Sequence, residues 1–485
     1  EYEQTVFLAT MGGTLFEMPN DYGPVQASFG VEYRKDEINS IPDAVARDGL
    51  FFGYFSDGGA MGSKDMTEAF FEMEAPLLMG EKFAKELTLN VSARITDDEI
   101  YGSNSTHSAK IGWRPINSLL IRGTYGTAFR APNLRELFLM AQTGFNTIFD
   151  PCYVPEEAID VFTGEYDSTA DPREAYVLDN CRATGMDPLT QGFASYSVEQ
   201  STGGSLTLDP ETSDSWTAGF SWEQEMTNEF DFGVGATYYE VDIDNTIIEP
   251  NGQYIVNDCY YTLTGQSAFC DRISRGADLA IDLLDNGFLN RDNEKARGVD
   301  VNLTFGDQLS VGTNVFDFVW DVRATRYIER STLFTDEDGN IDYEDYAGEW
   351  GFPSWKGEST MAVSWEKWRV QLRTNFTAAV EQEVLGIDPF SDIYDSQSTG
   401  TFGDTCLGTP VTCRDVGFAD DYMIHTLSAS YNEDNWGVSV GVRNLQDKAP
   451  PMVDGSEVTS KNNAAIGYGY DMMGRTIFVS AGYEF

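Results

Sequence analysis

The chain is poor in histidine and in basic residues, and it lacks any long apolar run. Two histidines, His107 and His425, are too few for a histidine-rich metal site. Lysine and arginine total 31 against 79 acidic residues, and the net charge of −48 excludes a nucleic-acid-binding role on electrostatic grounds. No run approaches the ~18 apolar residues that a transmembrane helix needs. Nucleic-acid binders and helical membrane proteins are therefore set aside.

Catalytic motifs are also missing. The sequence contains no GxSxG segment and no histidine cluster with metal-ligand spacing. Pairs of carboxylates are frequent, but 79 acidic residues bring many of them near one another by chance. We therefore expect no enzymatic activity and no catalytic residues. Disorder is excluded as well, because 13% aromatic and 41% hydrophobic residues exceed what disordered chains contain.

Cysteine is scarce, but its placement is informative. Six cysteines form three local pairs within polar, Gly- and Asp-rich segments: Cys152 with Cys181, Cys259 with Cys270, and Cys406 with Cys413. Such local pairs are typical of disulfides formed in an oxidising compartment. A zinc site, the alternative, needs CxxC-type spacing and neighbouring histidines. We predict three disulfides that clip loops.

What the sequence does contain is a series of alternating segments. In Pro24–Lys35, Phe230–Tyr238 and Gly298–Phe305, apolar residues occupy every second position and mostly polar or small residues lie between them. This period of two predicts β-strands with one apolar and one polar face. We predict about fifteen strands, several of ten or more residues, the length that crosses a bilayer when tilted. Strands of soluble proteins average ~5–6 residues. A soluble propeller would show a blade repeat of ~40–50 residues, and we find none.

One strand ends in an unusually long polar segment. In Ile121–Phe138, IRGTYGTAFRAPNLRELF, the alternation stops at Ala131-Pro132, because proline has no N–H for a sheet ladder. The next clean alternation begins near Thr212. Loops beyond ~15 residues are uncommon in compact soluble domains but ordinary on the outer face of a membrane β-barrel.

The other connections follow the same asymmetry. Short turns such as Arg114–Ser118 and Asn432–Asn435 mostly alternate with long loops, which lie near 37–64, 131–212, 249–293, 333–355, 385–420 and 448–473. Outer-membrane barrels have short periplasmic turns and long extracellular loops. Aromatic residues near strand ends suggest an aromatic girdle: Trp216, Trp222, Trp365, Trp368 and Trp436. We predict an all-β fold, a transmembrane antiparallel β-barrel over residues 1–485.

The direction of the strands bears on their total number. The first and the last visible strand both run inward, whereas single-chain bacterial barrels have an even number of strands and begin from the periplasm. We therefore expect an odd number of strands upstream of those visible here, and seven would give twenty-two. No signal peptide opens the sequence, EYEQTVFLATMGG, so either the mature chain starts here or an N-terminal part precedes it.

Five segments, in order along the chain, resemble the TonB-dependent outer-membrane receptors. They are YGTAFRAPNLRELF at Tyr125–Phe138, DPETSDSWTAGF at Asp209–Phe220, EKARGVDVNLTF at Glu294–Phe305, VRNLQDKAPP at Val442–Pro451, and GRTIFVSAGYEF at Gly474–Phe485. The last resembles the family's final strand, and the resemblance implies that Phe485 is the terminal aromatic read by the barrel-assembly machinery. The five segments are spread along the chain from Tyr125 to Phe485.

The resemblance implies a 22-stranded barrel plugged by an N-terminal domain, in the bacterial outer membrane. Such receptors import scarce, large solutes with energy passed through TonB, which grips a short box at the receptor's N-terminus. The plug and the box have no counterpart in this sequence, so we expect the C-terminal barrel portion. The implied partners are the TonB energy-coupling complex through that N-terminal region, outer-membrane lipid and lipopolysaccharide, and a surface lipoprotein.

The motif Phe129-Arg130-Ala131-Pro132-Asn133-Leu134 carries a structural prediction. Receptors for haem in this family share its first four residues and place a histidine in the following loop, but no histidine lies between His107 and His425. We therefore favour a structural role, in which Arg130 and Pro132 end the strand and brace the loop.

The long loops contain candidate ligand-binding residues. Aromatic rings beside carboxylates can stack on sugars and hydrogen-bond them, or they can pack the loops together: Tyr260, Tyr261, Tyr343, Tyr346, Trp350 and Tyr394. Asp336, Asp338, Asn340 and Asp342 offer oxygen ligands at alternate positions near a glycine, as Ca²⁺ requires. Their order is not that of an EF-hand, and a solvated acidic loop is the alternative. Apart from this possible Ca²⁺ in an extracellular loop, we expect no cofactor.

Ligand-gated active import is the leading functional hypothesis. The predicted solute is an oligosaccharide, because loop aromatics and carboxylates are plentiful and soft metal ligands are scarce. A ferric siderophore or a peptide is the alternative within the family. A passive porin and a surface adhesin barrel are alternatives of other classes.

Overall fold

The computed structural model describes residues 1–52, 55–160, 162–227, 230–262, 267–335, 341–380, 419–451, 460–461 and 464–484. One antiparallel sheet dominates it, with fifteen strands side by side and a sixteenth, β15 (Ile341–Asp345), paired to one of them. In order these are β1 (Tyr2–Glu17), β2 (Pro24–Ser40), β3 (Ala60–Glu81), β4 (Ala84–Asp98), β5 (Gly102–Ile116), β6 (Leu119–Arg130), β9 (Glu211–Thr227), β10 (Phe230–Ile248), β13 (Leu289–Val311), β14 (Asn314–Thr335), β16 (Trp355–Trp365), β17 (Trp368–Thr377), β18 (Tyr422–Asn432), β19 (Trp436–Arg443) and β22 (Thr476–Tyr483).

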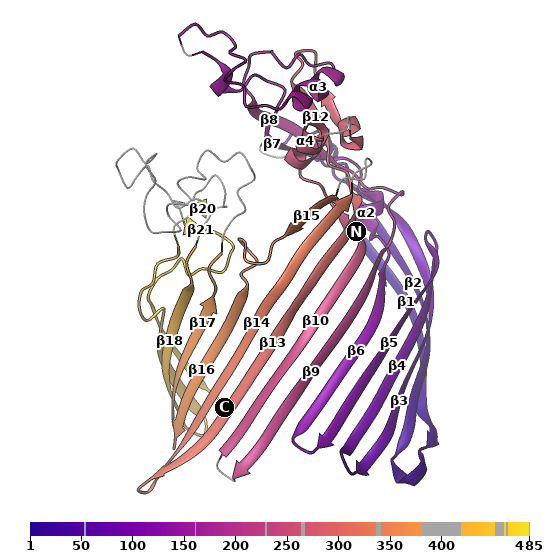
Figure 1. Cartoon of the computed structure of the whole chain (residues 1–485). Helices are drawn as coiled ribbons and strands as arrows, with labels where there is room; N and C mark the ends of the chain where they lie inside the picture. Colours follow the sequence, from indigo (N-terminus) through magenta and orange to yellow (C-terminus); the bar gives the residue numbers. More distant parts are fainter. Residues whose placement is uncertain are drawn as a thin grey trace.

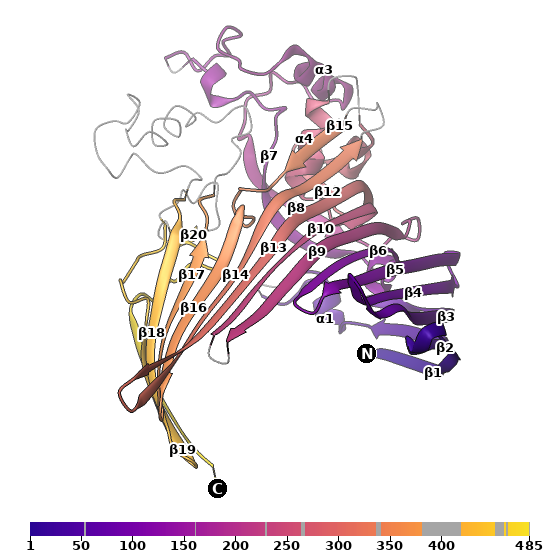
Figure 2. The same ribbon diagram turned by 60° about the horizontal axis from the view of Figure 1, so that its bottom comes forward.

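The fifteen neighbouring strands of this sheet confirm the predicted number of strands and the predicted antiparallel all-β fold. Each pairs with the next along the chain, and the sheet curves into the wall of an open barrel (Figures 1 and 2). Within the described residues, β1 and β22 stand at its two edges and do not pair with each other. No helix among the described residues is long and apolar enough to cross a membrane.

The two faces of the wall differ in chemistry. Across β10 and β13, Phe232 lies opposite Phe305 and Val234 opposite Leu303 on one face. On the other face, Gly235 lies opposite Asn302. The apolar side chains remain accessible, as Phe220 does at 40% exposure, because no protein layer covers this face. A single-layer sheet with an accessible apolar face suits contact with lipid on one side and a polar lumen on the other.

Aromatic side chains gather where the strands end. At the short-turn end an aromatic belt crosses the three strands β17, β18 and β19. The ring centroids of Trp368 and Tyr431 lie 4.9 Å apart, and those of Tyr431 and Trp436 lie 5.6 Å apart. Trp216 lies 4.9 Å from Tyr238 toward the opposite end. This distribution is that of the two interfacial girdles of a membrane barrel.

Several strands are longer than the predicted alternating segments. β10 runs ten residues beyond Tyr238, and β13 begins at Leu289 rather than near Gly298. The face that carries Phe232 and Val234 becomes charged in the added positions, where Glu240 lies opposite Arg297 and Asp242 lies opposite Lys295. On β10 the apolar residues Val241 and Ile243 occupy the other face, and residues 290–297 of β13 are mostly polar, so the hydrophobic period does not continue in the same phase.

The two ends of the wall differ in their connections. Short turns gather at one end, including the 3₁₀ turn η1 (Pro19–Asp21), and the long connections gather at the other (Figure 1). The long connections of the structure overlap the predicted ranges, with shorter bounds where β2, β3 and β13 extend into them, and 385–418 lies outside the described residues. The loop between β2 and β3 contains the short helix α1 (Ala44–Arg47), and the last connection contains β20 (Ser460–Lys461) and β21 (Ala464–Ala465).

The two longest connections fold together into one unit, which we call the cap (residues 131–210 and 249–288). Its four-stranded sheet has the order β11-β12-β8-β7 and combines strands from both connections (Figure 2). The cap contains α2 (Leu134–Phe138), β7 (Gln142–Phe149), η2 (Glu156–Ala158), α3 (Ala175–Ala183), β8 (Ser195–Thr202), α4 (Gly252–Tyr261), η3 (Ala268–Arg272), β11 (Ile273–Arg275) and β12 (Ile281–Asp285). A buried core includes Ile148, Val198, Ile255 and Leu284. The sequence did not predict this folding of the loops.

Candidate functional site

Arg130 joins three elements at the root of the cap. Its guanidinium donates to both carboxylate oxygens of Glu211, the first residue of β9, with one N–O distance of 2.7 Å. It also donates to Glu136 of α2 at 3.0 and 3.1 Å. Glu211 accepts a further hydrogen bond from the backbone N–H of Ile247, at the end of β10. Arg130 thus ties the end of its own strand to the next two strands of the wall.

The rest of the motif sets the turn from strand to helix. The Asn133 side chain accepts from the backbone N–H groups of Arg135 and Glu136, and the Glu136 carboxylate accepts from the Asn133 N–H at 2.7 Å. This reciprocal arrangement is a capping box. The buried Lys64 of β3 donates to the carbonyl of Pro132 at 2.6 Å. Phe129 is still paired in the wall, and Leu134 is buried.

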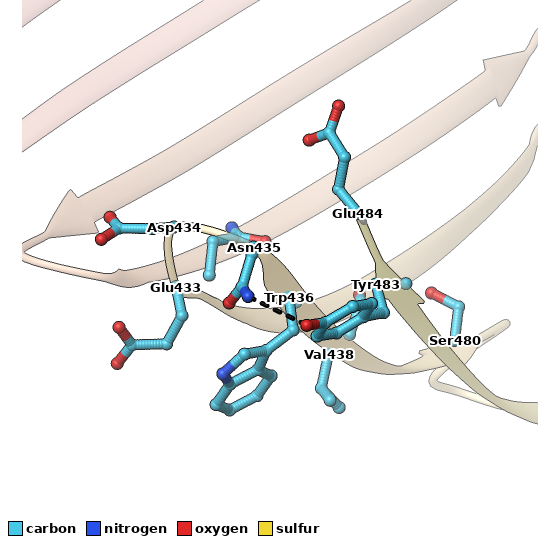
Figure 3. A pocket seen from close by; sticks show the side chains of 12 residues that line it. Glu433, Asp434, Asn435, Trp436, Val438, Ser480, Tyr483 and Glu484 are labelled. Carbon is cyan, nitrogen blue, oxygen red and sulfur yellow. Dashed lines mark hydrogen bonds between the residues drawn. The ribbon is translucent and has the colours of Figure 1, made fainter.

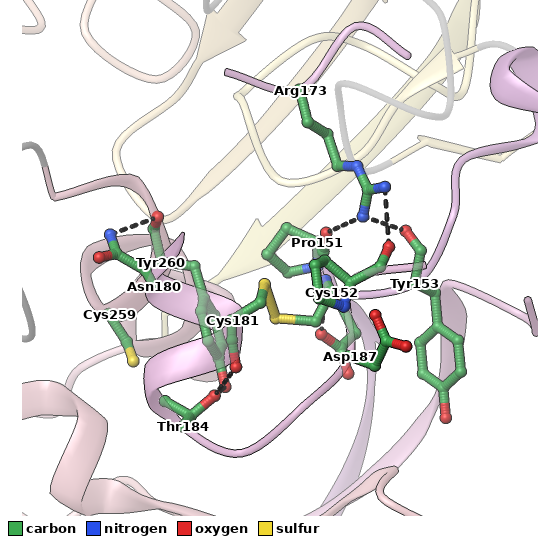
Figure 4. The surroundings of a disulfide bond; sticks show 12 residues. Pro151, Cys152, Tyr153, Arg173, Asn180, Cys181, Thr184, Asp187, Cys259 and Tyr260 are labelled. Carbon is green, nitrogen blue, oxygen red and sulfur yellow. Dashed lines mark hydrogen bonds between the residues drawn. A yellow bond between two sulfur atoms is a disulfide. The ribbon is translucent and has the colours of Figure 1, made fainter. Parts of the chain in front are cut away.

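Two of the three predicted disulfides are confirmed, Cys152–Cys181 and Cys259–Cys270. Figure 4 shows the first beside Arg173, whose guanidinium donates to the carbonyls of Pro151 and Tyr153 at 3.0 and 2.9 Å. The predicted pair Cys406–Cys413 lies outside the described residues.

Arg173 also pairs with Asp171, and both side chains are buried. Burial raises the pKa of the Asp171 carboxyl, but hydrogen bonds from Arg173 and Tyr166 outweigh burial and hold that pKa below its usual value. The carboxylate is therefore ionised and fixes the guanidinium that ties the loop around Cys152.

A buried ion pair clamps the two connections of the cap together. Arg275 donates to both oxygens of Asp150 at 2.6 and 3.0 Å. The Tyr196 hydroxyl donates to Asp150 at 2.8 Å, and Arg275 also donates to the Tyr260 hydroxyl at 2.9 Å. Burial is the largest cause that raises the pKa of Tyr196, so the phenol remains protonated. These contacts hold the cap together as one body.

The predicted ligand-binding aromatics lie in different parts of the structure. Tyr260 is fully buried in the cap core, and Tyr261 beside it is half-buried, with its pKa raised by burial. Trp350 is buried against Val380 and Ala419, and these residues form a second cluster with Tyr468 and Tyr470. In these positions Tyr260 and Trp350 pack loops together, the alternative that the sequence left open.

The described residues include part of the predicted loop 333–355. Tyr343 is 52% exposed, and its hydroxyl donates to Glu329 at 3.1 Å. Tyr346 is half-buried, and burial together with a hydrogen bond to Glu344 raises its pKa to about 12. Asp342 lies in β15, whereas Asp336, Asp338, Asn340 and Tyr394 lie outside the described residues, as does Phe485. In the described part of the chain, no three His, Cys, Asp or Glu side chains converge to hold a metal.

Several cavities line the inner wall and the root of the cap. One of about 380 Å³ lies where residues 203–208 face residues 285–290, and Arg272 forms part of its wall. One of about 560 Å³ on the wall is lined by charged residues including Arg323, Lys356 and Glu358. At the short-turn end, one of about 480 Å³ lies near the C-terminal strand, where the Asn435 amide donates to the Tyr483 hydroxyl at 3.2 Å (Figure 3).

Sequence reasoning missed Arg272 and its cavity. The cavity forms only because the segment after β8 and the segment after β12, about 80 residues apart, meet at the root of the cap. Neither segment has periodicity, and Arg272 belongs to no motif that we recognised. The glycines at 203, 204 and 287 were the only local signal, since they mark a close approach of backbone segments.

A long-stranded wall with a lipid-suited face, a polar inner face and a folded cap at one end defines the class: a barrel of the bacterial outer membrane. The chain belongs to the TonB-dependent receptor-like β-barrel family, whose model matches residues 2–445. This family consists of transporters and receptors rather than enzymes.

Solved structures share the fold. The ferric enterobactin receptor of Pseudomonas aeruginosa is 15% identical with a TM-score of 0.56, and the similarity covers 100% of this chain and 54% of that receptor. The siderophore receptor PirA of Acinetobacter baumannii is 14% identical with a TM-score of 0.53, over 100% of this chain and 55% of that one. The chain thus spans little more than half the length of these receptors.

A short sequence similarity points to the same family. The vitamin B12 transporter BtuB of Vibrio cholerae is 38% identical over 50 residues, which are 10% of this chain and 8% of that protein. The hemophore receptor HasR of Serratia marcescens, solved with its hemophore and heme, is 13% identical with a TM-score of 0.52, over 100% of this chain and 59% of that receptor.

Proposed function

We propose that the chain forms most of the wall and the outer mouth of a ligand-gated active importer in the outer membrane. The observation that carries the proposal is the cap: two connections fold into one body with its own core, two disulfides and a buried ion pair. A pore for unselective diffusion needs no such body at its mouth. A structured cap rooted on the wall by Arg130 and Lys64 suits recognition of a large solute.

The coupling partner in this proposal is TonB, engaged by the N-terminal region of the whole receptor. Outer-membrane lipid and lipopolysaccharide surround the apolar face, and a surface lipoprotein is a further candidate partner at the cap. The decisive experiment measures uptake of labelled solutes in matched strains with and without TonB. Uptake that continues without TonB would support a passive porin, and binding without any uptake would support an adhesin.

For the solute we retain an oligosaccharide, with a ferric siderophore or a peptide as the alternative. Burial of Tyr260 and Trp350 removes two of the aromatics on which the sugar preference first depended. The composition of the cap still bears on the choice. Residues 131–210 contain thirteen acidic and three basic residues, which disfavours a strongly anionic solute unless a local arginine offsets the charge. A competition assay that compares labelled oligosaccharides with ferric siderophores separates the two solutes.

Ca²⁺ bound by Asp336, Asp338, Asn340 and Asp342 remains a proposal for the loop before β16. Its test is direct, because calcium titration of the purified chain followed by calorimetry should give a saturable signal that D336N and D338N abolish. A signal that survives both substitutions would place the ion elsewhere.

A further inference from the structure

The cavity at the root of the cap carries a binding proposal of its own. Its volume is about 380 Å³, near the lower end of the range for small-molecule sites and suited to one ring-sized group. One wall comes from the segment that leads from β8 into β9, and the other from the segment that leads from β12 into β13. Any solute held there would contact the cap and the rim of the wall together.

Arg272 is the positively charged group of this cavity, and its position is fixed. Its Nη1 atom donates to the carbonyls of Asp285 and Gly287 at 3.1 and 2.9 Å. The guanidinium lies 5.8 Å from the centre of the Phe269 ring. Among the described residues no carboxylate pairs with it, in contrast to Arg173 and Arg275 of the same cap. A guanidinium has five N–H donors, so Nη2 and Nε retain donors for a ligand.

The remaining walls supply groups of another kind. The hydroxyls of Ser205 and Thr207 lie 2.7 Å apart and can each donate or accept. The Asp285 carboxylate accepts from the N–H of Gly287 through one oxygen, at 2.8 Å, and its second oxygen is available to accept from a ligand hydroxyl. The half-buried ring of Phe288 adds an apolar surface.

These groups together select one chemical class. A fixed guanidinium binds a carboxylate through two parallel hydrogen bonds. Hydroxyls and a carboxylate recognise ring hydroxyls, and an aromatic ring covers the apolar face of a sugar. A phosphate group fits less well, because its second negative charge would face Asp285 with a single arginine to offset both. We propose that this cavity binds a carboxylated sugar residue, a uronate, of the imported oligosaccharide; the identity of that oligosaccharide rests on the proposed function.

The test is calorimetric titration of the purified full chain, in detergent micelles, with D-glucuronate, D-glucose and inorganic phosphate. We expect glucuronate to bind at least tenfold more tightly than glucose or phosphate. R272Q should weaken glucuronate binding at least tenfold, because it removes the bidentate pair. R182Q is the matched control, since Arg182 is an exposed cap arginine paired with Asp179, and it should leave binding unchanged.

A second variant guards against damage to the cap by R272Q. A Cβ atom built on Gly203 meets only the carbonyl of Leu139, at 4.0 Å, so G203L can place a side chain into the cavity without displacing backbone. G203L should abolish glucuronate binding while the cap disulfides still form. Equal binding of glucose and glucuronate, or full binding by R272Q or G203L, would overturn the proposal.

Uptake assays separate this proposal from the importer proposal. If purified protein binds glucuronate through Arg272 but cells show no TonB-dependent uptake, the importer proposal fails and the binding site stands. If cells take up a uronate-containing oligosaccharide and R272Q does not change the apparent affinity, the binding site fails and the importer proposal stands.

Discussion

At the scale of single residues, the cap depends on a charge that has no access to water. The side chains of Asp150 and Arg275 are 0% and 10% exposed, and each also bonds a tyrosine. Removing one partner of a buried pair leaves the other charge uncompensated, which typically costs about 3–5 kcal/mol. Desolvation, rather than the number of contacts, makes this pair important.

We therefore predict that D150A lowers the free energy of cap opening by about 3–5 kcal/mol. Native-state hydrogen exchange, followed on peptides from residues 142–202, measures that free energy. The control is D179A, whose partner Arg182 is exposed, and it should change opening by less than about 0.5 kcal/mol. Equal effects of the two substitutions would show that the buried pair does not hold the cap.

A second residue-scale prediction concerns the fit of an aromatic ring over a glycine in the wall. A Cβ atom on Gly30 of β2 would lie 2.1–2.6 Å from ring atoms of Phe70 on the neighbouring β3. Arg94 in turn lies 5.0 Å from the centre of that ring. We expect G30A to destabilise the wall by about 1–3 kcal/mol through overpacking.

The measurement for G30A is the midpoint of urea unfolding of the chain in micelles, compared in the single and double variants. Because the three atoms nearest to the added methyl all belong to Phe70, the double variant G30A/F70A should lose this clash and show positive coupling. Strict additivity of the two changes would contradict this packing account.

At the scale of elements, each connection of the cap is clipped by its own disulfide. Cys152 and Cys181 are separated by 29 residues and close the part of the first connection that contains the start of α3. We predict that C152S/C181S lowers cap stability by about 3 kcal/mol, through loop closure in the opened state. Hydrogen exchange should show loss of protection in the cap, while peptides from β13 and β14 stay protected. Loss of protection in those strands too would contradict a separate cap.

Acid provides an independent test of the same element. The pKa of Asp171 is lower in the folded cap than its ordinary value of 3.8, so its ionised form stabilises the fold above that value. That contribution is lost as pH falls through the lowered folded-state pKa. We expect cap protection, corrected for intrinsic exchange rates, to hold at pH 5 and to weaken below about pH 4. D171N should already be weaker at pH 7 and should lack this pH dependence.

The sequence revealed the wall far better than the cap. Alternation between Phe230 and Tyr238 marks a strand because its apolar residues share one face of the wall. Beyond Tyr238 that face carries Glu240 and Asp242, and the apolar residues Val241 and Ile243 lie on the other face. The pattern therefore changes phase while the hydrogen-bonded ladder continues to Ile248. The cap strands β7 and β8 are short and mostly polar, and they find their partners only through the fold. Cys152 and Cys181 were visible in advance because local cysteine pairs need no fold to be recognised.

At the scale of the whole molecule, the two ends of the wall differ in their connections, and its two faces differ in polarity. Short turns and an aromatic belt mark one end, and the cap with the Trp350 cluster marks the other (Figure 1). In the proposed importer the capped end faces the medium and the short turns face the periplasm. In this orientation the cavity beside Arg272 lies at the root of the cap, and the cavity beside Arg323 lies on the wall.

The central claim is this orientation, and labelling of single cysteines on intact cells tests it most directly. Two variants carry the label. Asp179, replaced in D179C, is exposed on α3 of the cap, and Lys367, replaced in K367C, lies in the short turn between β16 and β17. With a maleimide reagent that does not cross the outer membrane, we predict labelling of D179C on intact cells and labelling of K367C only after the membrane is permeabilised. Labelling of K367C on intact cells, with D179C protected, would contradict the account.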